Sequence, residues 1–201
     1  MLKLVVNLSL FTLSLSEIIP SKRPRPQNVK GNLFVDESCI DCDVCRWICP
    51  TIYGRKGIKA AVIKQPSTDE DKLHAYSAMI SCPVGAIRTV AADPIVKQAL
   101  DIFPSEVNKC LRFSFSALLI FSLVLSTQID PYNIPGIFHL GYHSHETYGA
   151  TPYLVTRKDG NIMIDTPRFN ERLAKSIERL GDLKFIIITH QDDIGDHDKL
   201  E

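Results

Sequence analysis

Cys39-Ile-Asp-Cys42-Asp-Val-Cys45-Arg-Trp-Ile-Cys49-Pro50 places four cysteines within twelve residues, and Cys82 follows later in Ser81-Cys82-Pro83. Three of these cysteines are separated by two-residue gaps, so one short loop can present three soft thiolates to a compact inorganic core. The fourth ligand of such a core must come from elsewhere in the chain. This spacing predicts an iron-sulfur cluster.

The cysteine before Pro50 is expected to differ from the first three. In bacterial ferredoxins the run Cys-x2-Cys-x2-Cys-x3-Cys-Pro gives three cysteines to one cluster and its last cysteine to a second cluster. Only one such run is present here. Cys82, which also precedes a proline, is therefore the expected fourth ligand of a single 4Fe-4S cluster, together with Cys39, Cys42 and Cys45. Cys49 is expected to be a free structural thiol.

Disulfides and structural zinc are the alternative interpretations of these cysteines. Six cysteines in 201 residues are few for a disulfide framework. Structural zinc sites usually use two Cys-x2-Cys pairs, and the second pair is missing here. We favour the iron-sulfur interpretation over both.

The cysteine-rich segment resembles the ferredoxin domain of a plant, algal and cyanobacterial family that joins a 4Fe-4S ferredoxin to a metallo-β-lactamase-like domain. The resemblance rests on Gly31-Asn-Leu-Phe-Val-Asp-Glu-Ser-Cys39 continuing to Trp47, on Gln65-Pro66 and on Ser81-Cys82-Pro83-Val-Gly-Ala-Ile87. It implies a one-electron carrier or redox-sensing module. It also implies a location in the chloroplast or another intracellular compartment.

Local patterns place Cys82 at the end of a helix. Ser67-Thr-Asp-Glu70 is a capping-box pattern, and the apolar residues Leu73, Tyr76, Met79 and Ile80 follow at helical spacing. The pattern predicts a helix of about ten residues that Pro83 stops. Leu33–Val35 and Ala60–Ile63 are predicted to be short strands that cover the cluster. Residues 29–103 are thus expected to form a small α+β unit of ferredoxin-like fold.

The loop around the cysteines is rich in acidic residues. Asp36, Glu37, Asp41 and Asp43 are opposed locally only by Arg46. We expect either a docking patch for a basic redox partner or a simple solvated loop. Trp47, the single tryptophan, is expected to shield the cluster from water.

The stretch Gly136–Val155 is similar to the opening of the metallo-β-lactamase-like half of the same family, and the N-terminal part of that domain is expected over residues 136–201. Tyr153–Thr156 and Asn161–Ile164 flank Lys158-Asp-Gly160, which predicts a hairpin. A helix is expected over 168–180 and a buried strand over Phe185–Ile188. The predicted architecture is therefore a ferredoxin-like 4Fe-4S domain followed by an incomplete metallo-β-lactamase-like αββα half.

The residues that follow the last predicted strand differ from the metal-binding loop of that family. The candidate ligands are His190, Asp192, Asp193 and His197, which form an incomplete second metal site. A metal-dependent hydrolase or oxidoreductase is the alternative function, but we assign no catalytic residue and leave enzymatic activity unassigned. His143-Ser-His145 is interpreted as a polar loop, with a metal site as the alternative. His139 and His74 have no partner at ligand spacing.

Two further segments lie outside these units. Residues 104–135 are expected to be a linker with an apolar insertion, because Phe113–Ile129 is uncharged for 17 residues. A helix of that length reaches about 26 Å, against a hydrocarbon core of about 30 Å, so membrane association is an alternative. Residues 1–28 are expected to be an apolar leader with a basic, proline-rich linker. With 23 basic and 23 acidic residues, nothing indicates nucleic-acid binding.

Overall fold

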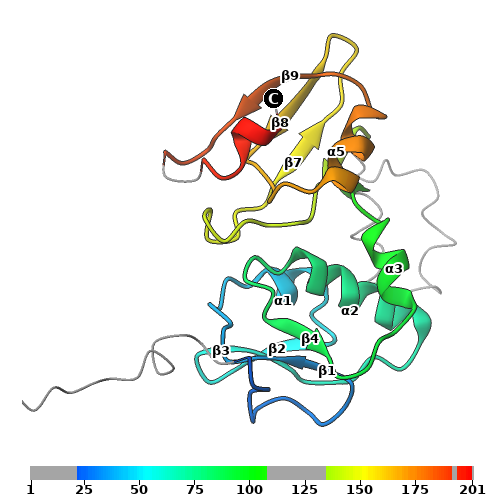
Figure 1. The fold of residues 1–201 in the computed structure, drawn as a ribbon, viewed down its shortest axis with the longest axis vertical. Helices are drawn as coiled ribbons and strands as arrows, with labels where there is room; N and C mark the ends of the chain where they lie inside the picture. The colour runs from blue at the N-terminus through cyan, green and yellow to red at the C-terminus, as the bar shows by residue number, and fades with distance from the viewer. Residues whose placement is uncertain (1–21, 108–134, 192–193, 201) are drawn as a thin grey trace, which may run out of the picture.

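The computed structural model describes residues 22–107, 135–191 and 194–200, which form two units that lie one above the other in Figure 1. The first unit contains the cysteines and the second contains a five-stranded sheet. The predicted leader over residues 1–21, the apolar segment 113–129 and Cys110 lie outside the described residues. Within the described residues no helix is long and apolar enough to span a bilayer.

The first unit is built from two small antiparallel sheets covered by helices. Strands β1 and β4 pair with each other, as do β2 and β3. Helix α2 packs on α1 and on α3. The elements are β1 (Leu33–Val35), α1 (Val44–Ile48), β2 (Tyr53–Lys56), β3 (Lys59–Val62), α2 (Asp69–Ser81), β4 (Ile87–Thr89) and α3 (Ile95–Leu100). The mixture of short strands and helices agrees with the predicted α+β class. Neither β2 nor β4 was predicted.

The predicted capping box of α2 is shifted by one residue. Thr68, not Ser67, is the N-cap, and its side chain accepts a hydrogen bond from the backbone N–H of Asp71. The Asp71 carboxylate in turn accepts hydrogen bonds from the backbone and hydroxyl of Ser67. Asp71, the third residue of the helix, therefore has the capping-box role that the sequence pattern predicted for Glu70. The helix runs for 13 residues and ends at Cys82, where Pro83 favours extended backbone.

Residues 22–28, predicted to belong to a linker, instead pack on the first unit. Pro24 forms an isolated β-bridge with Asp36. The buried guanidinium of Arg25 donates to the carbonyl oxygens of Ala60 and Lys56. These hydrogen bonds from Arg25 attach the segment to the β2–β3 hairpin. The first unit therefore begins before residue 29, the predicted boundary.

The second unit is a sheet of order β5-β6-β7-β8-β9. Pairing is antiparallel from β5 to β8, and β9 runs parallel to β8 after the crossover helix α5. The elements are β5 (Ser105–Glu106), β6 (Ile137–His139), β7 (Tyr153–Val155), β8 (Asn161–Ile164), α5 (Glu171–Glu178), β9 (Leu183–Ile187) and the 3-10 helix η3 (His197–Lys199). The predicted hairpin is confirmed as β7 and β8.

Two predictions for this unit need correction. The helix begins at Glu171 because Asn170 caps it, accepting from the N–H groups of Arg172 and Leu173. Strand β9 is not a buried strand. Phe185 is 54% exposed and Ile187 is 49% exposed, since alternate residues share one face and the described residues cover only the other.

The two units are joined by more than the chain. Strand β5, which falls in the predicted linker 104–135, pairs with β6 and so extends the sheet of the second unit directly from the end of the first. The Arg172 guanidinium forms an ion pair with Asp101. Phe103 packs edge-on against His139, with 5.4 Å between ring centroids.

Candidate iron-sulfur site

The cysteine loop wraps around a cavity by means of unusual backbone angles. Asp41 has φ of 60° and Asp43 has φ of 70°, both in the left-handed region that aspartate tolerates better than most residues. These two turns bend the chain between Cys39 and Cys45. Helix α1 then starts at Val44, directly after the second turn. Strained backbone of this kind is found where a loop must present groups to a ligand.

The four predicted ligands come together. Cys39, Cys42, Cys45 and Cys82 all line one small cavity between the loop, β1, β3 and the start of β4. Its other lining residues are mostly apolar, namely Val35, Ile40, Ala60, Val84, Ala86 and Ile87, together with Asp41 and Asp43. The four thiols that the sequence analysis named are therefore the ones that the fold gathers, including the remote one at the exit of α2.

The four cysteines need a positively charged group nearby if they are to be thiolates. The Sγ atom of Cys39 accepts from the N–H of Asp41 at 3.4 Å, and that of Cys82 accepts from the N–H of Ala86 at 3.3 Å. Burial raises the pKa of Cys42 to about 11, and the other thiolates add to that increase. Burial likewise raises the pKa of Cys45 and of Cys82. Four adjacent thiolates thus need nearby positive charge, which bound iron supplies.

A cluster fits this donor set better than a single ion does. Within the described residues, no three His, Cys, Asp or Glu side chains are arranged to hold one metal ion. Each thiolate of a 4Fe-4S cluster binds a different iron, so the four sulfurs surround a volume instead of one point. The described cysteines form no disulfide with one another.

Cys49 stands apart from the cavity. Its buried side chain lies 3.7 Å from the Thr51 hydroxyl and is absent from the cavity lining. Burial raises the pKa of this thiol. The residue caps the end of α1, where its N–H donates to the Cys45 carbonyl. These contacts agree with the predicted structural role, which stays a prediction.

The predicted acidic collar is largely neutralised. Asp36 is fully buried and forms an ion pair with Arg88 at 2.7 Å. Asp41 forms ion pairs with both Arg46 and Arg55. Arg46 is the local partner that the sequence indicated, and Arg55 and Arg88, which are distant in sequence, also reach the loop through β2 and β4. Exposed acidic side chains at this loop are Glu37 and Asp43, and the latter pairs with Arg46.

Trp47 does not shield the cavity as predicted. It is 52% exposed and is not among the cavity-lining residues. Its ring instead stands edge-on to the ring of His139 in the second unit, with 5.2 Å between centroids. Trp47 on helix α1 contacts the second unit, and apolar side chains of β1, β3 and β4 line the cavity instead.

A buried histidine pair was missed by the sequence analysis. The Nε2 atoms of His139 and His143 lie 2.9 Å apart, and both side chains are almost fully buried. His143 Nδ1 lies 2.9 Å from the carbonyl oxygen of Gly149. Burial lowers the pKa of His139 to about 3 and that of His143 to about 4, so both rings are neutral near pH 7. His145, in contrast, is exposed. The two residues are four apart outside any helix, which gave no signal of contact.

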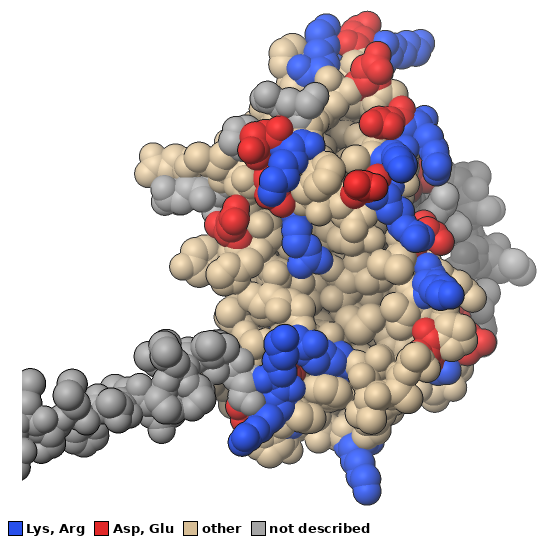
Figure 2. Space-filling view, in the orientation of Figure 1, with Lys and Arg blue, Asp and Glu red and all other residues tan. Residues whose placement is uncertain are grey.

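The loop that contains His143 lies against the cysteine loop. A Cβ atom added to Gly149 would stand 3.3 Å from Cys42 Cβ and 3.4 Å from side-chain atoms of Val44 and Pro83. Uncharged side chains make up most of the junction between the two units on the face shown in Figure 2. The second unit therefore contacts the candidate cluster site directly.

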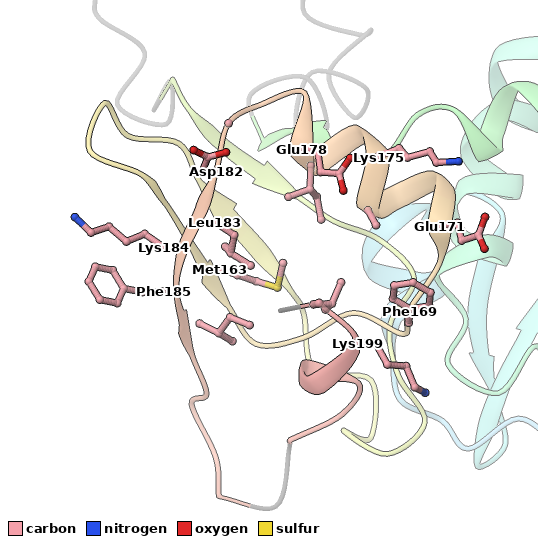
Figure 3. A pocket seen from close by; sticks show the side chains of 15 residues that line it. Met163, Phe169, Glu171, Lys175, Glu178, Asp182, Leu183, Lys184, Phe185 and Lys199 are labelled. Atoms are coloured by element: carbon pink, nitrogen blue, oxygen red, sulfur yellow. The ribbon is translucent and has the colours of Figure 1, made fainter.

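The second predicted metal site gains no support. His190 is exposed, Asp192 and Asp193 lie outside the described residues, and only the backbone of His197 is described. A groove of about 890 Å³ does exist in this unit between α5, β9 and η3. Figure 3 shows Met163 and Leu183 inside it, while Lys184 and Phe185 point away. Its mixed charges, Glu171, Lys175, Glu178 and Lys199, form no ligand set.

Comparison with known proteins identifies the first unit. The family model described as "4Fe-4S single cluster domain of Ferredoxin I" matches residues 35–89. No curated protein and no solved structure matches the chain. The resemblance of residues 136–201 to a metallo-β-lactamase-like domain stays a prediction. Residues 35–89 are a single-cluster ferredoxin-type domain, and the cofactor of this protein is a 4Fe-4S cluster.

Proposed function

We propose that this chain is a one-electron carrier or redox module whose single cluster is held by Cys39, Cys42, Cys45 and Cys82. The observation that carries the proposal is the convergence of these four thiols on one cavity inside a ferredoxin-type domain. A bound 4Fe-4S cluster supplies reversible one-electron chemistry. Substitution of Cys82 tests the coordination by these particular cysteines.

The protein contributes an environment for the charge. Val35, Ala60 and Ile87 exclude water from the cavity, and low solvent exposure disfavours added negative charge. The N–H groups of Asp41 and Ala86 have the opposite effect, because they stabilise negative sulfur at Cys39 and Cys82. Burial and N–H donation together set the reduction potential.

A redox partner would approach at the exposed side of the cysteine loop. Ile40 lines the cavity and is itself 37% exposed, so it separates the site from solvent by one side chain. Glu37 and Asp43 are exposed on the same loop and give it a weak acidic character. Electron exchange with a cationic protein should therefore slow only modestly when salt is raised.

The electron-carrier proposal is tested by redox titration of the protein purified without oxygen. The reduced form should show a paramagnetic signal that accounts for about one electron per chain and disappears on reoxidation. A cluster that is destroyed by the first reduction, or that takes up no electron down to the potential of dithionite, would contradict this function.

A further inference from the structure

Cys42 is the ligand closest to solvent. Cys39, Cys45 and Cys82 are 8%, 8% and 7% exposed, whereas Cys42 is only half-buried. The four cysteines are therefore least covered at Cys42, even with the second unit in place. The part of the chain that covers this side is the loop of the second unit around Gly149, which is itself buried.

Only glycine fits at position 149. Its φ of +85° lies in the left-handed region, and an added Cβ would meet Cys42, Val44 and Pro83 at 3.3 to 3.4 Å. The Gly149 N–H donates to the Ser144 carbonyl at 3.0 Å, which closes the loop on itself. The backbone thus lies against Cys42, and an added side chain would be strained and crowded against the cysteine.

The position of Gly149 is fixed by a chain of hydrogen bonds that begins in the sheet. A carbonyl oxygen only accepts, so His143 Nδ1 carries the proton that is donated to Gly149. A neutral imidazole has one N–H, so His143 Nε2 accepts from His139 Nε2. His139 sits on β6 between Ser105 and Tyr153 of the neighbouring strands. The rigid sheet therefore orients His139, which orients His143.

The His139 ring is held by packing more than by hydrogen bonds. His139 Nδ1 is buried and has no hydrogen-bond partner among the described residues. A buried acceptor without a partner costs free energy that an apolar residue would avoid. Phe103, Trp47 and Tyr153 pack around that ring and hold it in place.

We infer that His143 is a positioning residue, which holds the Gly149 backbone over Cys42 and so controls access of solvent and reagents to this side of the cluster. The inference rests on the proposed function, in which Cys42 is a cluster ligand. Losing the His143 hydrogen bond should let the loop move away from Cys42, while the three buried cysteines keep their cover from the first unit.

The first test uses the reduced, iron-free full-length chain, so that it does not depend on cluster binding. Alkylation of Cys42 by N-ethylmaleimide is followed by mass spectrometry, with the buried Cys49 as internal reference. His143→Leu should speed Cys42 labelling about tenfold, which is about 1.4 kcal/mol of local opening. His143→Asn retains a donor near the position of Nδ1 and should stay within about twofold of wild type. Equal Cys42 rates in His143→Leu and wild type, or equally fast labelling in both variants, would overturn the inference.

Fast labelling of Cys49 would reveal that His143→Leu unfolds the protein. In that case, two substitutions of glycine by alanine provide the test. Gly149→Ala should speed Cys42 labelling about tenfold, because the new Cβ pushes the loop from the cysteine. Gly57→Ala introduces comparable backbone strain at φ +70° with nothing within 4 Å, and it should leave the Cys42 rate unchanged. Equal rates in the two glycine variants would overturn the inference.

The holoprotein provides an independent measurement. Gly149→Ala should release iron to a chelator about tenfold faster than Gly57→Ala, and its reduction potential should differ from wild type because exposure sets the potential. Unchanged release and potential would contradict a role at the cluster. If wild-type protein binds no cluster, the proposed function fails, while Cys42 labelling still decides whether the loop covers the thiol.

Discussion

The ring of Trp47 on α1 stands edge-on to the imidazole of His139 on β6, with 5.2 Å between centroids and an interplanar angle of 85°. One residue belongs to the ferredoxin-type unit and the other to the second unit. The contact lies two residues after Cys45, so the two units meet beside the cysteine loop. The chain contains a single tryptophan, which makes this junction visible by fluorescence.

Replacing His139 with alanine should expose Trp47 further. The tryptophan loses the ring that covers one side of its indole, so acrylamide quenching of its fluorescence should increase in the iron-free chain. Ile58→Ala, at a side chain 77% exposed on the β2–β3 hairpin, should leave quenching unchanged. Identical quenching constants for His139→Ala and wild type would show that the two units do not meet at this contact in solution.

The buried histidines predict a loss of stability in mild acid. Burial lowers the pKa of His139 to about 3 and of His143 to about 4, from 6.5. Below pH 6.5 the unfolded chain therefore binds protons that the folded chain does not, and the free energy of unfolding falls as pH decreases toward 4. At pH 5 the loss should reach up to about 2 kcal/mol for each histidine.

Urea unfolding of the iron-free chain at pH 7 and at pH 5 measures this effect. The double variant His139→Leu with His143→Leu should lose most of the pH dependence. A smaller slope of the same sign should remain from His74, whose pKa is also lowered by burial. The interpretation would be wrong if wild type and the double variant lost equal stability between the two pH values.

Asp36 anchors the start of the cysteine loop. Its buried carboxylate accepts from the N–H and hydroxyl of Ser38 and forms an ion pair with Arg88. Asp36→Ala should lower the free energy of unfolding by about 1–3 kcal/mol, because Ser38 and Arg88 lose a charged acceptor. Asp43→Asn removes the charge that pairs with Arg46 and keeps a side chain that tolerates the positive φ at this position, so it should cost less than about 1 kcal/mol. Similar costs for the two variants, measured by urea unfolding, would contradict the assigned role of Asp36.

Arg25 should matter for the stability of the first unit. Its guanidinium is buried and donates to the carbonyl oxygens of Ala60 and Lys56 on the hairpin. Arg25→Ala should lower the free energy of unfolding by about 1–3 kcal/mol, and Arg23→Ala serves as the comparison at an exposed neighbour. If both substitutions were neutral in urea unfolding, residues 22–28 would be a linker, as the sequence suggested.

The features that could be predicted from the sequence are those set by neighbouring residues. The two-residue gaps of the cysteine run, the stop at Pro83 and the Asp-Gly turn each act within a few positions, and the structure contains all three. The helix cap was misplaced because serine and threonine both cap well, and only the Asp71 contacts decide between them.

The features that could not be predicted depend on contacts between distant residues. Arg55 and Arg88 neutralise the acidic loop from β2 and β4, far along the chain from Asp41 and Asp36. His139 ends a strand and His143 lies in the loop after it, so their four-residue spacing indicates no contact. The exposed face of β9 likewise follows from which residues cover the sheet, because an apolar run such as Phe185–Ile188 reads as buried in any context.

Iron and acid-labile sulfide analysis of the protein purified without oxygen tests the assigned cluster ligation most directly, with Cys82→Ala and Cys49→Ala measured beside wild type. Wild type and Cys49→Ala should each contain about four irons and about four sulfides per chain, and Cys82→Ala should lose them. Retention of the cluster in Cys82→Ala with its loss in Cys49→Ala would contradict the ligand assignment. Zinc without sulfide in wild type would contradict the iron-sulfur site itself.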